Sequence, residues 1–324
     1  HLEACLASVL EQTTLPIELI VIDDGDLPAP PLRDAFASKG IAYIYRRKEE
    51  PGLTESRNLG VSLARGDILC FLDDDVVLEP DFLERTLEVY RSDSEHAIGG
   101  VGFGDGATPG SWLLWLRRLY NLVFLISGVR AGRVLPSGFC TNLGEGFVRF
   151  RRPMRAFFLG GAAMSYRREV FDRWHFTPGY HQIAVGEDKD FSHRVARGGY
   201  ELVITPLARL YHAETEEMRP DKRGVGRKFV VGRYLFFREF GPRHPLAWIL
   251  FWWALGGYLL SRVAVAVATG SARERERVRG IVEAMRDIAA GRLRDALVPA
   301  GTALHGGHPA AGPGLSPDPP APRT

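Results

Sequence analysis

The first hundred residues alternate between two spacings of apolar side chains. Leu2, Leu6, Val9 and Leu10 recur at helical intervals. Residues 17–22 form a continuous apolar run, typical of a strand buried on both faces of a parallel sheet. The order then repeats, with helices expected at 32–38, 54–64 and 81–91 and strands at 41–45 and 68–72. This alternation predicts an α/β fold with a doubly wound sheet, whose ligands bind beyond the carboxyl ends of the strands.

After Gly110 the pattern of apolar residues changes. We expect an aromatic, apolar segment at 111–126, a strand at 157–166 interrupted by Gly160 and Gly161, a helix at 187–197, and short strands at 202–204 and 208–212. Residues 216–243 are basic, 245–269 are strongly apolar, and 271–297 form an arginine-rich helix candidate. From Pro299 the chain is rich in Pro, Gly and Ala without periodicity, which predicts a disordered tail.

Composition narrows the class of protein. The 324 residues are 45% hydrophobic and 25% charged, enough for a sizeable core. A mean hydropathy of −0.08 excludes a polytopic membrane protein. With 41 basic and 39 acidic residues, a nucleic-acid partner is not expected. The three cysteines lie far apart, without zinc spacing, which favours a reducing compartment. Because the chain starts at His1 rather than Met, we expect it to be cut at its N-terminus.

Three adjacent carboxylates, Asp73, Asp74 and Asp75, follow the strand predicted at 68–72. A hard divalent cation with phosphate oxygens would relieve their mutual repulsion. Because Asp73 and Asp75 are two residues apart, they point to the same side of an extended chain, so one can face a ribose while the other reaches a metal. A solvated acidic loop that caps the helix after Pro80 is the structural alternative.

A second acidic pair, Asp23 and Asp24, also ends a predicted strand and precedes Gly25. These carboxylates could accept hydrogen bonds from a nucleotide base or from ribose hydroxyls, and Gly25 lets the backbone turn tightly beside a ligand. An Asx-type turn, which Asp-Gly forms readily, explains the same residues without any ligand.

Two further motifs suggest chemistry. Arg57 lies early in a predicted helix and can form a fork to a phosphate or to one of the aspartates, although it could equally sit on a solvated helix face. Glu187 and Asp188 open another predicted helix, where acidic residues are favourable for dipole reasons alone. A carboxylate there could instead serve as the general base that deprotonates a sugar hydroxyl attacking an anomeric carbon.

Taken in order, these motifs resemble the inverting family 2 glycosyltransferases of the GT-A fold. The matching stretches are DDG at 23–25, GLTESRNLG at 52–60, GDILCFLDDD at 66–75, FLGGAAMSYRREVF at 158–171 and GEDKDFSHRVARGGY at 186–200. The resemblance covers residues 1–212, and the triple-Asp strand end followed by Glu-Asp discriminates best. It implies a mixed, doubly wound sheet flanked by helices, followed here by apolar and amphipathic C-terminal helices.

The resemblance also implies a role for each matching position. Five residues are expected to bind the donor, the first two at its base and ribose: Asp23, Asp24, Arg57, Asp73 and Asp74. Asp75 is the expected metal ligand, and His212 matches a position that in some relatives helps to hold metal or diphosphate.

On the acceptor side, Gly160 and Gly161 match the turn beside the acceptor. Asp188 matches the catalytic base, with Glu187 as the runner-up. The cofactor implied is Mn²⁺ or Mg²⁺. The predicted reaction is inverting transfer of a sugar from a nucleoside-diphosphate sugar to a glycan or lipid-linked acceptor, as in polysaccharide biosynthesis.

The resemblance divides the chain into four parts. Residues 1–110 would form the nucleotide-sugar-binding half without the family's first strand, 111–215 the acceptor-binding half, 216–298 a helical, membrane-associated region, and 299–324 the disordered tail. Asp26 stands where Ser or Thr is usual. No QXXRW-like motif follows, which disfavours a processive synthase.

The apolar segment 245–269 raises the question of a membrane. A helix over 245–260 would be about 24 Å long, short of the roughly 30 Å hydrocarbon core, and extension to Thr269 places Arg262 inside. Arginines flank both ends, so neither orientation of a single span is favoured. We therefore expect an in-plane or re-entrant helix in the cytoplasmic leaflet, with 111–126 beside it and Arg117 and Arg118 at the headgroups.

The predicted location is thus the cytoplasmic face of the cell membrane, as a peripheral or monotopic protein. A buried helix packed on the catalytic domain is the alternative. Two other functions stay open. A nucleotidyltransferase on a similar sheet would want a Gly-rich, Lys-containing phosphate loop near the N-terminus, and none is present. A non-catalytic nucleotide-sugar-binding module would not need Asp188.

Overall fold

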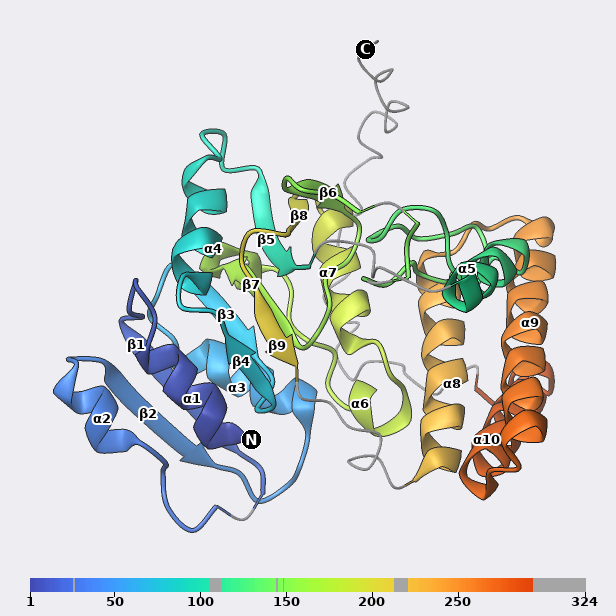
Figure 1. The fold of residues 1–324 in the computed structure, drawn as a ribbon, viewed down its shortest axis with the longest axis horizontal. Helices are drawn as coiled ribbons and strands as arrows, with labels where there is room; N and C mark the ends of the chain where they lie inside the picture. The colour runs from blue at the N-terminus through green and yellow to red at the C-terminus, as the bar shows by residue number, and fades with distance from the viewer. Residues whose placement is uncertain (26, 105–111, 144, 148, 213–220, 294–324) are drawn as a thin grey trace.

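The computed structural model describes residues 1–25, 27–104, 112–143, 145–147, 149–212 and 221–293. A mixed sheet with helices against it leads into three long C-terminal helices (Figure 1). The tail predicted to be disordered, 299–324, lies outside the described residues.

The first half of the chain alternates as its apolar spacing predicts. Its elements are α1 (Leu2–Leu10), β1 (Glu18–Asp23), α2 (Arg33–Ser38), β2 (Ala42–Arg47), α3 (Leu53–Leu63), β3 (Ile68–Leu72), β4 (Val76–Leu78), α4 (Phe82–Arg91) and β5 (Ile98–Phe103). One expectation needs correction. The run at 17–22 is half-buried rather than buried on both faces, because β1 pairs only with β2 among the described strands.

The second half is more irregular. Its elements are α5 (Trp112–Val123), β6 (Met154–Ala156), β7 (Ala163–Arg167), the 3₁₀ turn η1 (Arg168–Asp172), α6 (Tyr180–Ile183), α7 (Glu187–Arg197), β8 (Glu201–Thr205), β9 (Leu210–His212), α8 (Lys222–Phe240), α9 (Pro245–Thr269) and α10 (Ala272–Ala289). The single strand expected at 157–166 is wrong. The chain leaves the sheet after β6 and re-enters it at β7, with Gly160 and Gly161 in the loop between them.

The central sheet has the order β3-β7-β5-β8-β6. Strand β7 is antiparallel to β3 and β5, β8 is parallel to β5, and β6 is antiparallel to β8. Strands β3, β5 and β8 therefore end at one edge of the sheet, where β7 and β6 begin. This edge, called the carboxyl edge below, is where an α/β sheet of this kind offers its ligand site.

Each face of the sheet has its own apolar core, as two-residue alternation requires. Val203 of β8 packs with Val101 and Phe82 on the side of α4. Its neighbours Leu202 and Ile204 pack on the opposite side, where α7 supplies Phe191. The helices are thus held on either side of the strands that end at the carboxyl edge.

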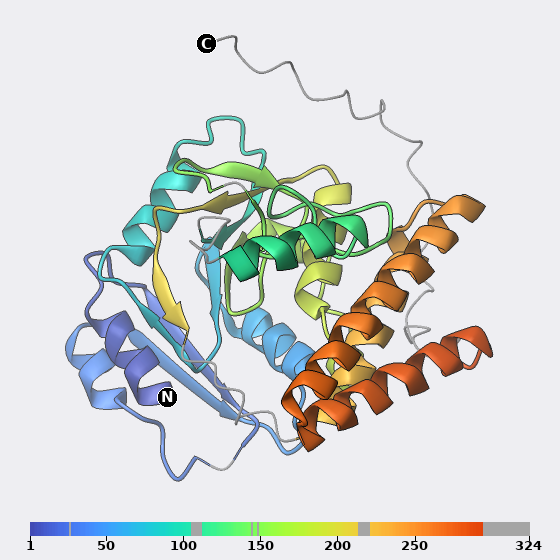
Figure 2. The same cartoon turned by 45° about the vertical axis from the view of Figure 1, so that its right-hand side comes forward.

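Helices α8 and α10 cross with their backbones in direct contact at Gly226 and Gly280. A Cβ on Gly280 would lie 2.0 Å from the carbonyl oxygen of Arg223, so no side chain fits there. The same helix α8 touches the segment that leads into α7, because a Cβ on Gly232 would lie 2.0 Å from the Val185 oxygen. The C-terminal helices therefore pack against the sheet domain (Figure 2).

Helix α9 is buried on one side only. Phe251, Ala254 and Leu255 are fully buried, whereas Ile249 is 64% and Val267 is 78% exposed. Among the described residues, α9 is the one helix long and apolar enough to cross a membrane. Helix α5 lies beside it, as predicted for 111–126, since Trp253 Nε1 donates to the Val123 carbonyl at 3.0 Å.

Candidate active site at the carboxyl edge

Two aspartates and a histidine meet where β3 ends. Asp73, Asp75 and His212 each bring one ligand atom to within 4.8 Å of the others. The register explains the meeting, because β4 pairs with β9 and places Val76 opposite His212. Nε2 of His212 lies 3.0 Å from Oδ1 of Asp75. The middle residue Asp74 is exposed and stands outside this group.

The group fits a divalent cation. Asp75 is only 9% exposed, and its Oδ1 faces Nε2 of His212 at 3.0 Å without a well-formed hydrogen bond in the described chain. Carboxylates as close as those of Asp73 and Asp75 repel each other, and a bound cation would relieve that repulsion. Two carboxylates with one imidazole are a donor set that suits Mn²⁺ or Mg²⁺ bound together with phosphate oxygens.

Arg57 connects this cluster with the rest of the carboxyl edge. Its side chain is buried, and Nη2 donates to Oδ1 of Asp73 at 3.3 Å and to the Gly161 carbonyl at 3.1 Å. Nη1 donates to Oε1 of Glu187 at 3.2 Å. One guanidinium thus holds together the end of β3, the glycine loop before β7 and the start of α7.

The carboxyl pKa values differ across this network. Burial raises the pKa of Asp73 to about 6, although the Arg57 guanidinium opposes the shift. Burial would also raise the pKa of Glu187, but the nearby His181 imidazole and the Arg57 charge outweigh it and lower the pKa to about 2. A carboxylate whose pKa lies below its ordinary range is a weaker proton acceptor, so the Arg57 contact disfavours Glu187 as a base.

Asp188 lies against the glycine loop. A Cβ on Gly161 would be 3.3 Å from Oδ2 of Asp188, so the absence of a side chain leaves that oxygen room. Oδ1 accepts the Lys189 backbone N–H at 2.8 Å, and Lys189 Nζ is 3.9 Å from Oδ2. Gly186, at φ 113°, takes the left-handed conformation that starts α7 here.

The carboxylates of Asp23 and Asp24 accept hydrogen bonds from protein groups. Oδ1 of Asp23 accepts the Gly25 N–H at 2.9 Å, the turn expected for Asp-Gly, and Oδ2 accepts the Tyr45 hydroxyl at 2.6 Å. Oδ2 of Asp24 accepts the Gly52 N–H at 2.9 Å and the Ser56 hydroxyl at 3.2 Å. Asp24 therefore ties the end of β1 to the start of α3.

Two residues of α3 were missed as contributors to the site. Asn58 forms two hydrogen bonds with the backbone of Phe176, at 2.8 and 3.0 Å, and Glu55 accepts the Gly179 N–H at 2.7 Å. Together with Arg57 they fasten α3 to the segment that precedes α7. The polar residues of the GLTESRNLG stretch could have predicted these contacts. Glu55 and Asn58 lie on the same helix as Arg57, so their side chains can reach the same partner segment.

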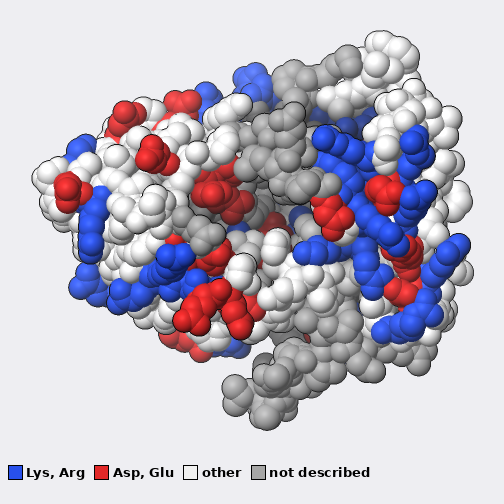
Figure 3. Space-filling view, turned by 90° about the horizontal axis from the view of Figure 1, so that it is seen from below, with Lys and Arg blue, Asp and Glu red and all other residues white. Residues whose placement is uncertain are grey.

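Charge is unevenly distributed over the surface that Figure 3 presents. Acidic side chains gather around a hollow near the middle of this face, and lysines and arginines gather on the side of α8 and α10. Several of these arginines form ion pairs between the helices, as Arg223 does with Glu283 and Arg227 with Asp287.

Comparison with known proteins identifies a family for this arrangement. Residues 1–174, more than half of the chain, match glycosyl transferase family 2. A glucosyl-dolichyl phosphate glucuronosyltransferase of Haloferax volcanii is 33% identical over 96 residues, 29% of this chain and 31% of that protein. The glycosyltransferase EpsH of Bacillus subtilis is 31% identical over 99 residues, 30% of this chain and 29% of that protein.

A solved structure shares the fold. The mannosyltransferase PcManGT of Pyrobaculum calidifontis, in complex with GDP-Man and Mn²⁺, aligns with a TM-score of 0.52 at 16% identity, over 88% of this chain and 83% of that one. The expected family and the mixed, helix-flanked GT-A sheet are confirmed. The matches to the two curated relatives span about a third of their lengths.

Proposed function

Because the chain belongs to glycosyl transferase family 2, we propose that it transfers a sugar from a nucleoside-diphosphate sugar to a glycan or lipid-linked acceptor, with inversion at the anomeric carbon. One observation carries this proposal. The cluster of Asp73, Asp75 and His212 is joined through Arg57 and Gly161 to Asp188. A metal-ready group and a candidate base thus stand on one edge of the sheet.

On the donor side, Asp75 and His212, with Asp73, would hold Mn²⁺ or Mg²⁺. Such an ion, when bound, would neutralise the charge that develops on the leaving diphosphate. Asp23 and Asp24 would form the wall for base and ribose, because Oδ2 of Asp23 and Oδ1 of Asp24 keep lone pairs for a ligand donor beside the described hydrogen bonds. Exposed Asp74 would contact the donor from the solvent side.

On the acceptor side, Gly160 and Gly161 leave space for a hydroxyl next to Asp188. In the transfer, the acceptor oxygen bonds to the anomeric carbon while the bond to the diphosphate oxygen breaks, and Asp188 takes the hydroxyl proton. Glu187 is bound to Arg57 with a pKa of about 2, which favours Asp188 as the base. Arg57 positions the two sides relative to each other.

A membrane surface is the proposed partner of α5 and α9. Of the twenty exposed large apolar side chains in the described residues, six lie on α5 and eight on α9. Because the inner side of α9 is packed on the protein, the helix would lie in the plane of the cytoplasmic leaflet. Exposed Arg243 and Arg273, just outside its two ends, suit lipid headgroups.

Vesicle binding tests this location. Trp112→Gln combined with Ile249→Gln should abolish co-sedimentation with anionic phospholipid vesicles, whereas Ile17→Gln, an equally exposed apolar residue elsewhere, should leave it intact. A protein that is fully soluble without detergent and ignores such vesicles would contradict the proposal.

A donor screen tests the proposed reaction. Thermal unfolding is followed with UDP, dTDP and GDP sugars, each with Mn²⁺, with Mg²⁺ or with EDTA. We expect one donor class to raise the melting temperature only when metal is present, and to be consumed when an acceptor is added. Stabilisation by nucleoside triphosphates alone would favour the nucleotidyltransferase. Donor binding without transfer to any acceptor would favour the non-catalytic binding module.

A further inference from the structure

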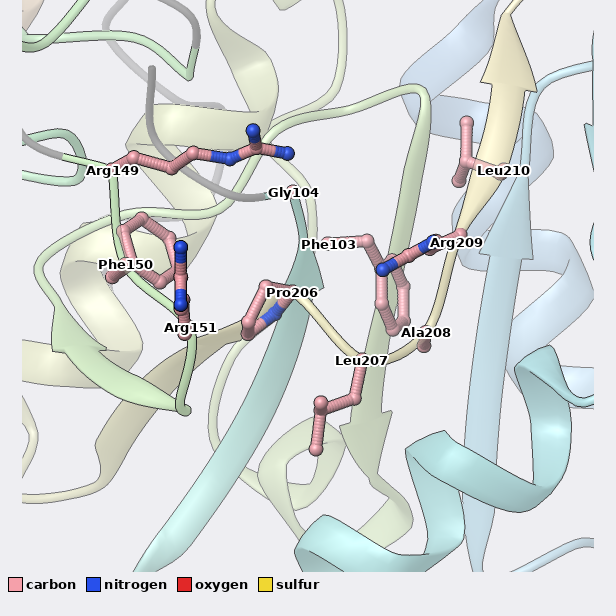
Figure 4. A pocket seen from close by; sticks show the side chains of 10 residues that line it. All are labelled: Phe103, Gly104, Arg149, Phe150, Arg151, Pro206, Leu207, Ala208, Arg209 and Leu210. Atoms are coloured by element: carbon pink, nitrogen blue, oxygen red, sulfur yellow. The ribbon is translucent and has the colours of Figure 1, made fainter. Parts of the chain in front are cut away.

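A second hollow opens at the carboxyl edge, beyond the ends of β5 and β8 (Figure 4). Its volume is about 710 Å³. Three arginines, Arg149, Arg151 and Arg209, line it together with apolar side chains that include Phe103, Phe150 and Leu207. We call it the arginine hollow. The glycosyl-transfer scheme above uses none of these residues.

The sheet sets the distance between this hollow and the metal-ready cluster. Gly104 N–H donates to the Thr205 carbonyl at 3.0 Å, so the ends of β5 and β8 lie side by side. With the order β3-β7-β5-β8 and strands about 4.8 Å apart, those ends are about 10 and 14 Å from the end of β3. The hollow therefore lies on the same edge but toward β8, apart from the end of β3, and β9 runs from its Leu210 to His212 of the cluster.

The charge of the hollow points to an anion. Its arginines come from two separate segments, the one before β6 and the one between β8 and β9, and none of its lining residues in the described part of the chain is acidic. Arg151 and Arg209 are exposed, so their guanidinium groups can take up a ligand without breaking a buried contact. Guanidinium forks match phosphate oxygens in pairs, which makes arginine the preferred residue for phosphate.

The apolar lining separates this hollow from a plain basic surface. Leu207 of the lining is 45% exposed, and the aromatic ring of Phe150 stands beside Arg151 in Figure 4. A ligand with a phosphate next to a hydrocarbon group would use both kinds of lining. The acidic donor cluster, by contrast, offers no apolar contact among its three members.

We propose that the arginine hollow binds a phosphate group of the acceptor, so that the acceptor class is a glycan carried on a phosphate. This inference rests on the proposed glycosyl transfer and names its acceptor more closely. The separation from the cluster keeps the phosphate away from the reacting centre, so the accepting hydroxyl belongs to a sugar and not to the phosphate itself. The hollow then sets how far along the glycan the new sugar is added.

The test measures binding in EDTA, which removes metal-dependent binding at the Asp75 cluster. Calorimetric titrations of the full chain use geranyl phosphate, inorganic phosphate and glucuronic acid as probes. We expect geranyl phosphate to bind, and Arg151→Gln with Arg209→Gln to weaken its Kd about tenfold for each charge removed. Arg91→Gln, at the end of α4, is the matched control and should leave the Kd unchanged.

The affinities for geranyl phosphate and inorganic phosphate distinguish a lipid-linked phosphate from a phosphate without lipid. Tighter binding of geranyl phosphate than of inorganic phosphate supports a lipid-linked acceptor, and equal binding supports a phosphate without lipid. Equal affinity of the wild type and the double variant, an equal loss in Arg91→Gln, or tighter binding of glucuronic acid than of either phosphate would overturn the inference.

The proposed transfer is judged separately. Nucleotide-sugar binding with Mn²⁺, measured in the same variants, should be unaffected by the loss of the two arginines. If the donor binds but geranyl phosphate and inorganic phosphate do not, the arginine hollow is misassigned while the transfer proposal stands. If no nucleotide sugar binds, the transfer proposal itself fails.

Discussion

Two strand ends of this protein look alike in sequence and differ in how their carboxylates are satisfied. Asp23 and Asp24 follow β1, and the triple-Asp cluster follows β3. In the first pair both carboxylates accept protein donors, from the backbone of Gly25 and Gly52 and from the Tyr45 and Ser56 hydroxyls. In the second, the buried Oδ1 of Asp75 faces Nε2 of His212 at 3.0 Å and accepts no well-formed hydrogen bond within the described chain.

The difference separates two uses of the same residue type. Satisfied carboxylates close the turn after β1 and anchor α3, so they contribute to the fold whether or not a nucleotide binds. At the end of β3 two carboxylates and an imidazole converge instead, and a cation would relieve the repulsion between the carboxylates. The partners of each oxygen, rather than the number of adjacent aspartates, are why we propose the end of β3 as the place for a cation.

The largest expected effect comes from Asp75→Asn. This change removes one carboxylate of the metal-ready cluster, so we expect sugar transfer with Mn²⁺ to fall about 10³-fold or more, as when a main electrostatic stabiliser of a transition state is lost. The thermal midpoint should stay unchanged or rise, because one of two neighbouring carboxylates that repel each other disappears. Transfer rates and thermal unfolding of the same preparation measure both effects. Wild-type transfer in this variant, or full activity in EDTA, would refute the metal assignment.

Asp188→Asn extends the comparison to a third carboxylate, one with a free side toward Gly161. We expect kcat to fall about 10²-fold while donor affinity stays close to the wild type, the usual scale for a lost general base. Transfer rates beside calorimetric donor binding make the measurement. If Asp188→Asn is active and Glu187→Gln is dead, the base is Glu187. If both variants transfer normally, the pair serves only the start of α7.

Asp24→Ala should act on folding. The Gly52 N–H and the Ser56 hydroxyl lose their acceptor, so the free energy of unfolding should fall by about 1–3 kcal/mol. Chemical denaturation measures the change, and Asp172→Ala, an exposed aspartate in η1, is the control that should have little effect. An Asp24→Ala protein as stable as the control would show that this pair is not structural.

The smallest effect concerns pH. Burial opposes ionisation of Asp23, but the Tyr45 hydroxyl and backbone donors outweigh it, so its pKa lies below the ordinary value of 3.8. The unfolded chain then binds more protons at acid pH, and this contribution to stability is lost as the pH falls through that window. Asp23→Asn should flatten the decline of the unfolding free energy below about pH 4. If the unfolding free energy of the variant declines at acid pH as it does in the wild type, this prediction is wrong.

Much of the fold could be predicted because apolar spacing records local structure. Residues 68–72, 187–197 and 245–269 were each expected as the element found there. The strand expected at 208–212 is β9, whereas the three-residue strand β4 was not expected, because it is defined by pairing with residues about 135 positions away. The error at 157–166 has the same origin, since neighbouring residues enter the sheet at different places.

The site divides in the same way. The proximity of Asp73 and Asp75 could be predicted from their two-residue spacing, and His212 was assigned only through a family resemblance. Arg57 was expected to form a fork to a donor phosphate or to one of the aspartates, and the structure pairs its guanidinium with Asp73. What the sequence could not show is that the same guanidinium also binds Glu187 and the Gly161 carbonyl, which come from distant segments. Its assignment to the donor remains a prediction.

The contact between α8 and the segment before α7 limits how this protein can be shortened. Gly232 lies so close to the Val185 carbonyl that α8 supports the segment leading to Asp188. A shortened chain that ends before α8 would remove that support together with the apolar surface of α9. Engineers seeking a soluble enzyme should therefore keep all three C-terminal helices and replace only outward side chains such as Ile249 and Val267.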